Sequence, residues 1–121
     1  MSAPRNERRV HPRFPRSLEL SGSAISGGAS ARLISSDLSL GGAYCTSDRA
    51  FPEMTRLAVR LLLPAREADR ERAEPIDLAA VVVRHKRLLA HPEGERHELA
   101  LLFTSMSPEQ RDRLAHYLTH P

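Results

Sequence analysis

Apolar and polar residues alternate along much of this chain with a two-residue period, which places successive side chains on opposite faces of a β-strand. The pattern begins at Leu18 and Leu20. It returns in four longer stretches: 31–45, 56–63, 76–89 and 96–103. The first of these carries Gly41 and Gly42 near its end, so we expect two strands there, joined by a tight turn. About six short strands are therefore predicted.

Two segments between the predicted strands lack a face that could pack against a core. Residues 22–30 are small and glycine-rich, which predicts a hairpin loop. Residues 65–74 are highly charged and lie between Pro64 and Pro75. We expect this second segment to form an exposed loop with at most a helical turn.

The pattern changes after residue 106 from strand to helix. Ser107 is a favoured N-cap, Pro108 suits the first helical position, and Gln110 completes a capping box. The apolar residues that follow recur at the spacing of one helix face: Leu114, Tyr117 and Leu118. A C-terminal helix that packs one face on the strands is therefore predicted.

Short antiparallel strands in this number close most readily into a barrel, because closure leaves no exposed sheet edge. The predicted fold class is all-β with a C-terminal helix, namely a six-stranded antiparallel β-barrel of the split-barrel kind. The 121 residues correspond to a single domain. We expect a flexible basic arm over residues 1–16, the barrel over 17–104 and the helix over 105–121.

The positive charge is concentrated in the arm. Residues 1–16 carry five arginines against Glu7, a net charge of +4, whereas the whole chain is +3, so the other 105 residues sum to −1. A surface that binds nucleic acid would more often be basic across the domain. Aromatic residues, which single-stranded nucleic acid stacks on, are also few, with no Trp, two Tyr and three Phe. Nucleic acid is therefore a disfavoured partner.

Several other classes lack their sequence signals. Cys45 is alone, which excludes an intrachain disulfide and a cysteine metal site. The chain has no GxSxG, HExxH or GK[ST] motif. We therefore expect that it is not an enzyme and that it binds no metal or cofactor. His85, His91 and His97 recur at six-residue steps and are predicted to be surface residues. Without a long apolar run or a signal-peptide core, the expected location is the cytoplasm.

Two short stretches carry candidate chemistry. ERRVHPR contains Pro12 and is followed by Pro15, and both disfavour a helix, so we expect Arg9 and Arg13 on an extended or irregular segment with their guanidinium groups free for an anion. DLSLGG spaces an acid, a hydroxyl and a glycine at Asp37, Ser39 and Gly42. On a strand, Asp37 and Ser39 would share one face, and Gly42 would permit a sharp turn or a close approach to a ligand.

Together, RxxxR and the later DxSxxG resemble the paired signature of the PilZ family, and the resemblance extends over nearly the whole chain. It implies a six-stranded barrel that binds the bacterial second messenger cyclic di-GMP. It carries over to this chain as the following ligand-binding residues: Arg9, Arg13, Asp37, Ser39 and Gly42. It also implies that Arg8 influences whether one ligand or an intercalated pair is held. Arg84, at the end of VVVR, lies near the site by the same resemblance.

The ligand suits these residue types. An arginine fork matches the two acceptors on the Hoogsteen edge of guanine, and a carboxylate accepts from the N–H donors on its Watson–Crick edge. Neutralising the arm would draw it over the barrel, an order–disorder switch that signals to an unidentified effector protein. The alternative is a PilZ-type adaptor that controls motility or pili without a ligand. Pathway, stoichiometry and oligomeric state stay open.

Overall fold

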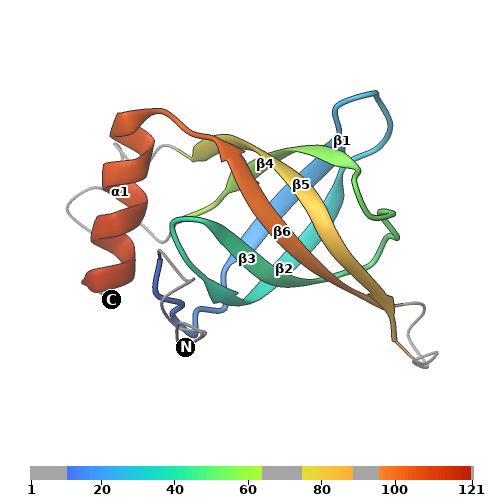
Figure 1. Ribbon diagram of the computed structural model, residues 1–121, viewed down its shortest axis with the longest axis horizontal. Helices are drawn as coiled ribbons and strands as arrows, with labels where there is room; N and C mark the ends of the chain where they lie inside the picture. Colours follow the sequence, from blue (N-terminus) through green and yellow to red (C-terminus); the bar gives the residue numbers. More distant parts are fainter. Residues whose placement is uncertain (1–10, 64–74, 89–95, 121) are drawn as a thin grey trace, which may run out of the picture.

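The computed structural model describes residues 11–63, 75–88 and 96–120, and within them the chain forms a closed β-barrel with one helix at its end (Figure 1). The strands are β1 (Glu19–Ala24), β2 (Ala31–Leu38), β3 (Gly42–Ser47), β4 (Arg56–Leu61), β5 (Ile76–Arg87) and β6 (His97–Ser105). They neighbour one another in the order β1-β2-β3-β6-β5-β4, and β1 pairs with β4 to close the barrel. Every pairing is antiparallel, so the predicted fold is confirmed.

The barrel closes around the inward members of the alternating pattern. Leu20, Leu33, Leu57 and Leu99 come from four different strands, and each is fully buried. Burying one such side chain contributes about 1.5–3 kcal/mol, so the apolar interior is the main favourable term in folding. The outward members of the same strands remain available for a surface site.

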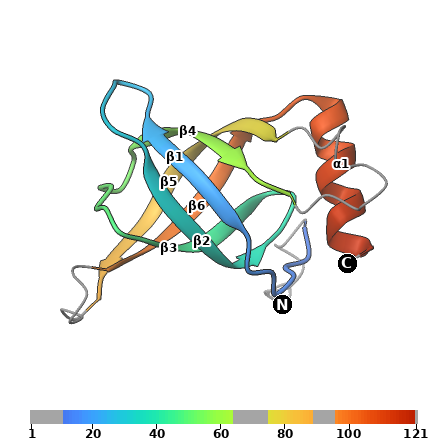
Figure 2. The ribbon, with the colours of Figure 1, turned by 180° about the vertical axis from the view of Figure 1, so that it is seen from behind.

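Helix α1 (Pro108–Thr119) covers one end of the barrel (Figures 1 and 2). Its capping box forms as predicted, with the Ser107 hydroxyl accepting from the Gln110 N–H and the Gln110 side chain accepting from the Ser107 N–H. Leu114 and Leu118 are buried in the core. No helix among the described residues has both the length and the apolar character needed to cross a membrane.

The first loop is shorter than the sequence predicts. Strand β1 continues to Ala24, because Gly22, Ser23 and Ala24 pair with Val59, Ala58 and Leu57 of β4. Gly22 is small enough for this position, since a Cβ there would lie 3.1 Å from the Leu33 side chain. The prediction of a loop beginning at residue 22 was therefore wrong. The predicted loop over 65–74 lies outside the described residues.

The histidines also differ from expectation. His97 is buried at 3% exposure, and its Nδ1 lies 2.9 Å from Nε2 of His85. The two rings stack with their centroids 5.0 Å apart. His97 occupies an inward position of β6, so it is buried like the leucines that follow it, and ring-to-ring hydrogen bonding satisfies its nitrogen. The prediction of a surface residue was wrong for His97, and His91 lies outside the described residues.

Cys45 gives a chemical test of the closed barrel. The thiol is buried at 1% exposure, and burial, together with the nearby Asp37 charge, raises the pKa of Cys45 from 9.0 to about 12. Because the thiolate is the reactive form, alkylation near pH 8 should be slowed about a thousandfold relative to the unfolded chain.

We expect iodoacetamide to label Cys45 rapidly in denaturant and negligibly in buffer, as measured by mass spectrometry over time. Equal rates in both conditions would mean that the β3 thiol is not enclosed by the barrel.

Candidate functional site

The arm reaches the barrel at Phe14. Its N–H donates to the Leu38 carbonyl, and the Leu38 N–H donates back to the Phe14 carbonyl, both at 2.9 Å. The Phe14 ring packs on the hydrophobic core. Ser35 adds a second connection, because its hydroxyl donates to the Arg16 carbonyl at 2.6 Å and accepts from the Leu18 N–H at 2.9 Å. These contacts place residue 13 beside the end of β2.

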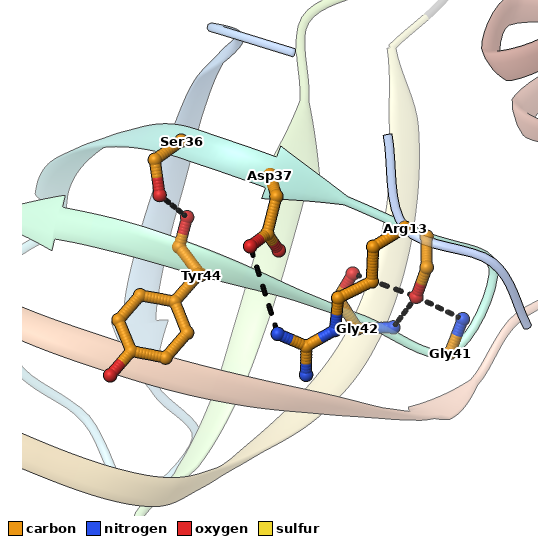
Figure 3. A network of polar contacts seen from close by, with 7 residues as sticks. Arg13, Ser36, Asp37, Gly41, Gly42 and Tyr44 are labelled. Atoms are coloured by element: carbon orange, nitrogen blue, oxygen red, sulfur yellow. Dashed lines mark hydrogen bonds and ion pairs between the residues drawn. The ribbon is translucent and has the colours of Figure 1, made fainter. Parts of the chain in front are cut away.

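Arg13 and Asp37, predicted from separate motifs, face each other at this point. Arg13 Nη1 lies 3.6 Å from Asp37 Oδ2, and the two side chains are 46% and 32% exposed (Figure 3). The separation is too long for a hydrogen bond, and exposed ion pairs of this kind contribute about 0–1 kcal/mol. The pair therefore keeps most of its hydrogen-bonding groups available to a ligand.

Ser39 lies in the turn that joins β2 to β3. Its Oγ accepts from the N–H groups of Gly41 and Gly42, both at 3.1 Å, and its own N–H donates to the Gly42 carbonyl at 2.9 Å. Strand β2 ends at Leu38, and its register shifts between Ser35 and Asp37. The expectation that Asp37 and Ser39 share a strand face was therefore wrong, because the chain has already begun to turn at Ser39.

Gly42 is the first residue of β3, and its missing side chain faces another strand. A Cβ at this position would collide with the carbonyl oxygen of Leu101 on β6. Gly41 is also crowded, since a Cβ there would lie 2.9 Å from Cδ2 of His11. Gly42 therefore permits the close approach of the β6 backbone.

A row of outward side chains extends the site across four strands. Asp37 of β2 lies opposite Tyr44 of β3, Tyr44 lies opposite Ala100 of β6, and Ala100 lies opposite Arg84 of β5. Directly paired residues of antiparallel strands place their side chains on the same face. All four are at least partly exposed. Figure 3 shows Tyr44 beside Asp37 on this face.

Sequence reasoning missed two members of this row, Tyr44 and Ala100. A signal existed for Tyr44, which follows Gly42 by two residues and must point outward if Ala43 points into the core. Ala100 gave none, because only the strand register places it between Tyr44 and Arg84. Arg84 lies at the end of this row, and its contact with a ligand stays a prediction. Arg8 and Arg9 lie outside the described residues.

The fold and the site define a class: a small closed barrel with a polar cluster on its outer face, where Arg13 approaches Asp37 beside the β2–β3 turn. The sequence model of the PilZ domain matches residues 5–120. The chain therefore belongs to the PilZ domain family. None of the curated proteins matches it in sequence.

Solved structures share the fold at low sequence identity. The inhibitor of motility MotI/DgrA from Bacillus subtilis superposes with a TM-score of 0.69 at 22% identity, over 97% of this chain and 54% of that one. The PilZ domain of YcgR from Escherichia coli, solved with c-di-GMP, gives 0.66 at 18% identity over 93% and 89%. The K. pneumonia MrkH–c-di-GMP complex gives 0.68 at 16% identity over 93% and 51%. This chain thus spans about half the length of MotI/DgrA and MrkH.

Substituting Gly42 tests whether its role is structural. We expect Gly42→Ala to lower the free energy of unfolding by about 2 kcal/mol or more, since the new methyl group must displace β6 backbone. The measurement is the urea midpoint followed by circular dichroism.

Gly22→Ala is the matched control, because its Cβ would meet the ends of the Leu33 and Leu57 side chains and no backbone, and we expect a change below about 1 kcal/mol. Equal stability of the Gly42 variant and the unmodified chain would contradict the structural role.

Proposed function

We propose that this chain is a receptor domain for cyclic di-GMP that signals to a partner protein. The observation that carries the proposal is the meeting of Arg13 and Asp37, from motifs 24 residues apart in the sequence, on one exposed face. Membership of the PilZ family supports it, as do the titles of two similar structures, which name c-di-GMP as the bound ligand.

The chemistry of guanine fits this pair. The Arg13 fork presents parallel N–H donors that match O6 and N7 of guanine or two phosphate oxygens. The Asp37 carboxylate accepts from the N1–H and N2–H donors of the same base. An acid beside the arginine also repels a bare phosphate, so the pair favours a nucleotide over inorganic anions. We assign Arg9 the same type of contact as Arg13.

Ser39 and Gly42 act on the ligand through the turn. The Ser39 hydroxyl is already engaged by two backbone N–H groups, and Gly42 faces β6. Their proposed part is therefore to fix the turn that holds Asp37 outward and receives the arm at Leu38. Loss of either residue should weaken binding by changing the shape of the site.

Tyr44, Ala100 and Arg84 form a place for one base. Ala100 has only a methyl group, so it leaves an open position between the phenol of Tyr44 and the guanidinium of Arg84. The outer strands of this trio lie about 9.6 Å apart, twice the usual interstrand spacing. Aromatic rings and guanidinium planes both stack on purines. A base over Ala100 would thus lie beside the polar contacts of Arg13 and Asp37.

Binding would also neutralise the arm. The free arm carries Arg8 and Arg9, whose charges repel those of Arg13 and Arg16, whereas a doubly negative ligand attracts all four. The backbone hydrogen bonds between Phe14 and Leu38 attach the chain to the barrel directly after Arg13. The proposed signal is the new surface that forms when these residues close over the bound dinucleotide. At micromolar affinity the binding free energy would be about −8 kcal/mol.

Removing either member of the central pair should abolish measurable binding while the fold survives. We expect Arg13→Ala and Asp37→Ala to give no heat in isothermal titration with cyclic di-GMP and an unchanged circular dichroism spectrum. Each loses a charge-assisted contact of about 1.5–3 kcal/mol, and the remaining member of the pair is left mispaired with the ligand.

Arg32→Ala and Asp77→Ala are the controls, because these exposed charges pair with Glu19 and Arg60 away from the site. Unaltered affinity in both test variants would remove the assignment of the site. A folded unmodified chain that does not bind at all would favour the ligand-independent adaptor.

Tyr44 tests the base platform separately. We expect Tyr44→Ala to weaken cyclic di-GMP about tenfold, since stacking on an aromatic ring contributes about 1–3 kcal/mol per base. Tyr44→Phe should bind like the unmodified chain, because it retains the ring. Thr46→Ala, at the next outward position of β3, is the control. A Phe variant as weak as the Ala variant would assign the effect to the hydroxyl and reject stacking.

A further inference from the structure

A second surface lies on the barrel wall, outside the ligand site. It is an open groove of about 440 Å³ on the outer face of β4 and β5, bounded by the end of β6, the residue after β1 and the turn before β4. The lining includes Ile25, Met54, Arg56, Ala79, Val81 and Thr104. We call this surface the β4–β5 groove.

Several exposed apolar residues lie in or beside the groove. Met54 is 75% exposed and Ile25 57%, and Leu102, 48% exposed, lies directly opposite Val81 of the lining. The Ile25 N–H donates to the Arg56 carbonyl, and Arg56 lies opposite Val81, so these residues form one continuous row. Single exposed apolar side chains are ordinary, but a connected set beside a groove is typical of a contact surface.

Met54 is held in a conformation that methionine disfavours. Its φ is 72°, in the left-handed region, at the third position of a turn closed by the Thr55 N–H donating to the Pro52 carbonyl. Glycine or asparagine usually occupies such a position. The Met54 side chain contributes little to the core of the barrel, because it is the most exposed of the large apolar residues described. An exposed side chain held in a disfavoured backbone conformation is a candidate for a role in binding.

Arg56 defines the chemistry of the occupant. It is the one charged residue in the groove lining, and no ion pair involves it among the described residues. A partner that covered the groove would remove water from this guanidinium and would have to supply an anion in exchange. The apolar walls require hydrophobic side chains beside that anion. Methionine, which is flexible and polarizable, suits such a contact.

We propose that the β4–β5 groove docks an amphipathic peptide segment of an effector protein. Its apolar side chains lie against Met54, Ile25 and Val81, and an Asp or Glu carboxylate pairs with Arg56. This inference rests on the proposed function, because a receptor without chemistry of its own acts through a contacting partner. It adds the place of that contact and the chemical character of the segment.

The groove borders the ligand site. The row that links Arg56, Val81, Leu102 and Gly42 runs next to the row that links Arg84, Ala100, Tyr44 and Asp37. A docked segment would thus lie beside a bound dinucleotide on the same sheet face.

A displayed library of random peptides, selected on the full chain, tests the proposal. We expect the enriched peptides to combine large apolar residues with an Asp or Glu. For a synthetic copy of the strongest binder, Arg56→Glu and Met54→Gly should each weaken binding by about tenfold or more in fluorescence anisotropy. Replacing the peptide's acid with arginine should restore binding to the Arg56→Glu chain. Met54→Gly suits the positive φ, so the variant keeps its turn.

Arg111→Glu, on the exposed face of α1, and Ile34→Ser, at a 40% exposed position of β2, are the matched controls and should bind normally. Peptides without an acid, or binding indifferent to the Arg56 and Met54 variants, would overturn the proposal. Self-association of the chain that Met54→Gly abolishes in sedimentation would also overturn it, in favour of a second copy.

Cyclic di-GMP titrations of the same variants separate the two hypotheses. If cyclic di-GMP binds but no peptide binds the groove, only the docking proposal is rejected. If cyclic di-GMP does not bind but peptides bind through the groove, only the receptor assignment is rejected, and the docking proposal remains supported.

Discussion

The turn from Ser39 to Gly42 is the constraint on which the rest of this structure depends. One serine hydroxyl holds the two N–H groups that reverse the chain, and the missing side chain of Gly42 lets β3 lie against the Leu101 carbonyl of β6. That pairing joins the β1–β2–β3 half of the barrel to β6, β5 and β4. The same turn leaves Leu38 beside Phe14 and directs Asp37 outward. Barrel closure, arm attachment and the position of the acid therefore share one local geometry.

This dependence changes the meaning of the DxSxxG motif in this chain. Three residues spaced for ligand contact divide into one that faces the solvent, Asp37, and two that build the turn, Ser39 and Gly42. The spacing in the sequence does not distinguish a residue that faces the solvent from one that forms the turn, because both occur near the end of a strand. The hydrogen bonds of Ser39 and the contact of Gly42 with another strand make the distinction. Under the proposed function, the direct contacts with the ligand would then come from the arginines and the acid.

The sequence predicts the strands, the helix and the closed antiparallel fold, because period-two alternation and the capping box are local signals. It fails where partners distant in the sequence decide. Gly22 was predicted to lie in a loop, but it pairs with β4 and belongs to a strand. His97 was predicted to lie on the surface, but it occupies an inward position of β6. The meeting of Arg13 with Asp37 could be expected only from the family resemblance. The row through Tyr44 and Ala100 needs the register, which the alternation alone leaves undetermined.

Under the proposed function, a closed barrel also restricts how this domain can transmit a signal. Every strand pairs on both sides, and a core at native packing density resists gradual deformation, so a ligand on the outer face has little means of reshaping the barrel. The change must instead lie in what the outer face displays. Successive outward residues of a strand lie about 7 Å apart, so the ligand row and the groove row are neighbours on the same strands. A bound ligand and the arm closed over it would therefore form part of the surface that a partner contacts. The partner would then bind the groove and the ligand-covered face together.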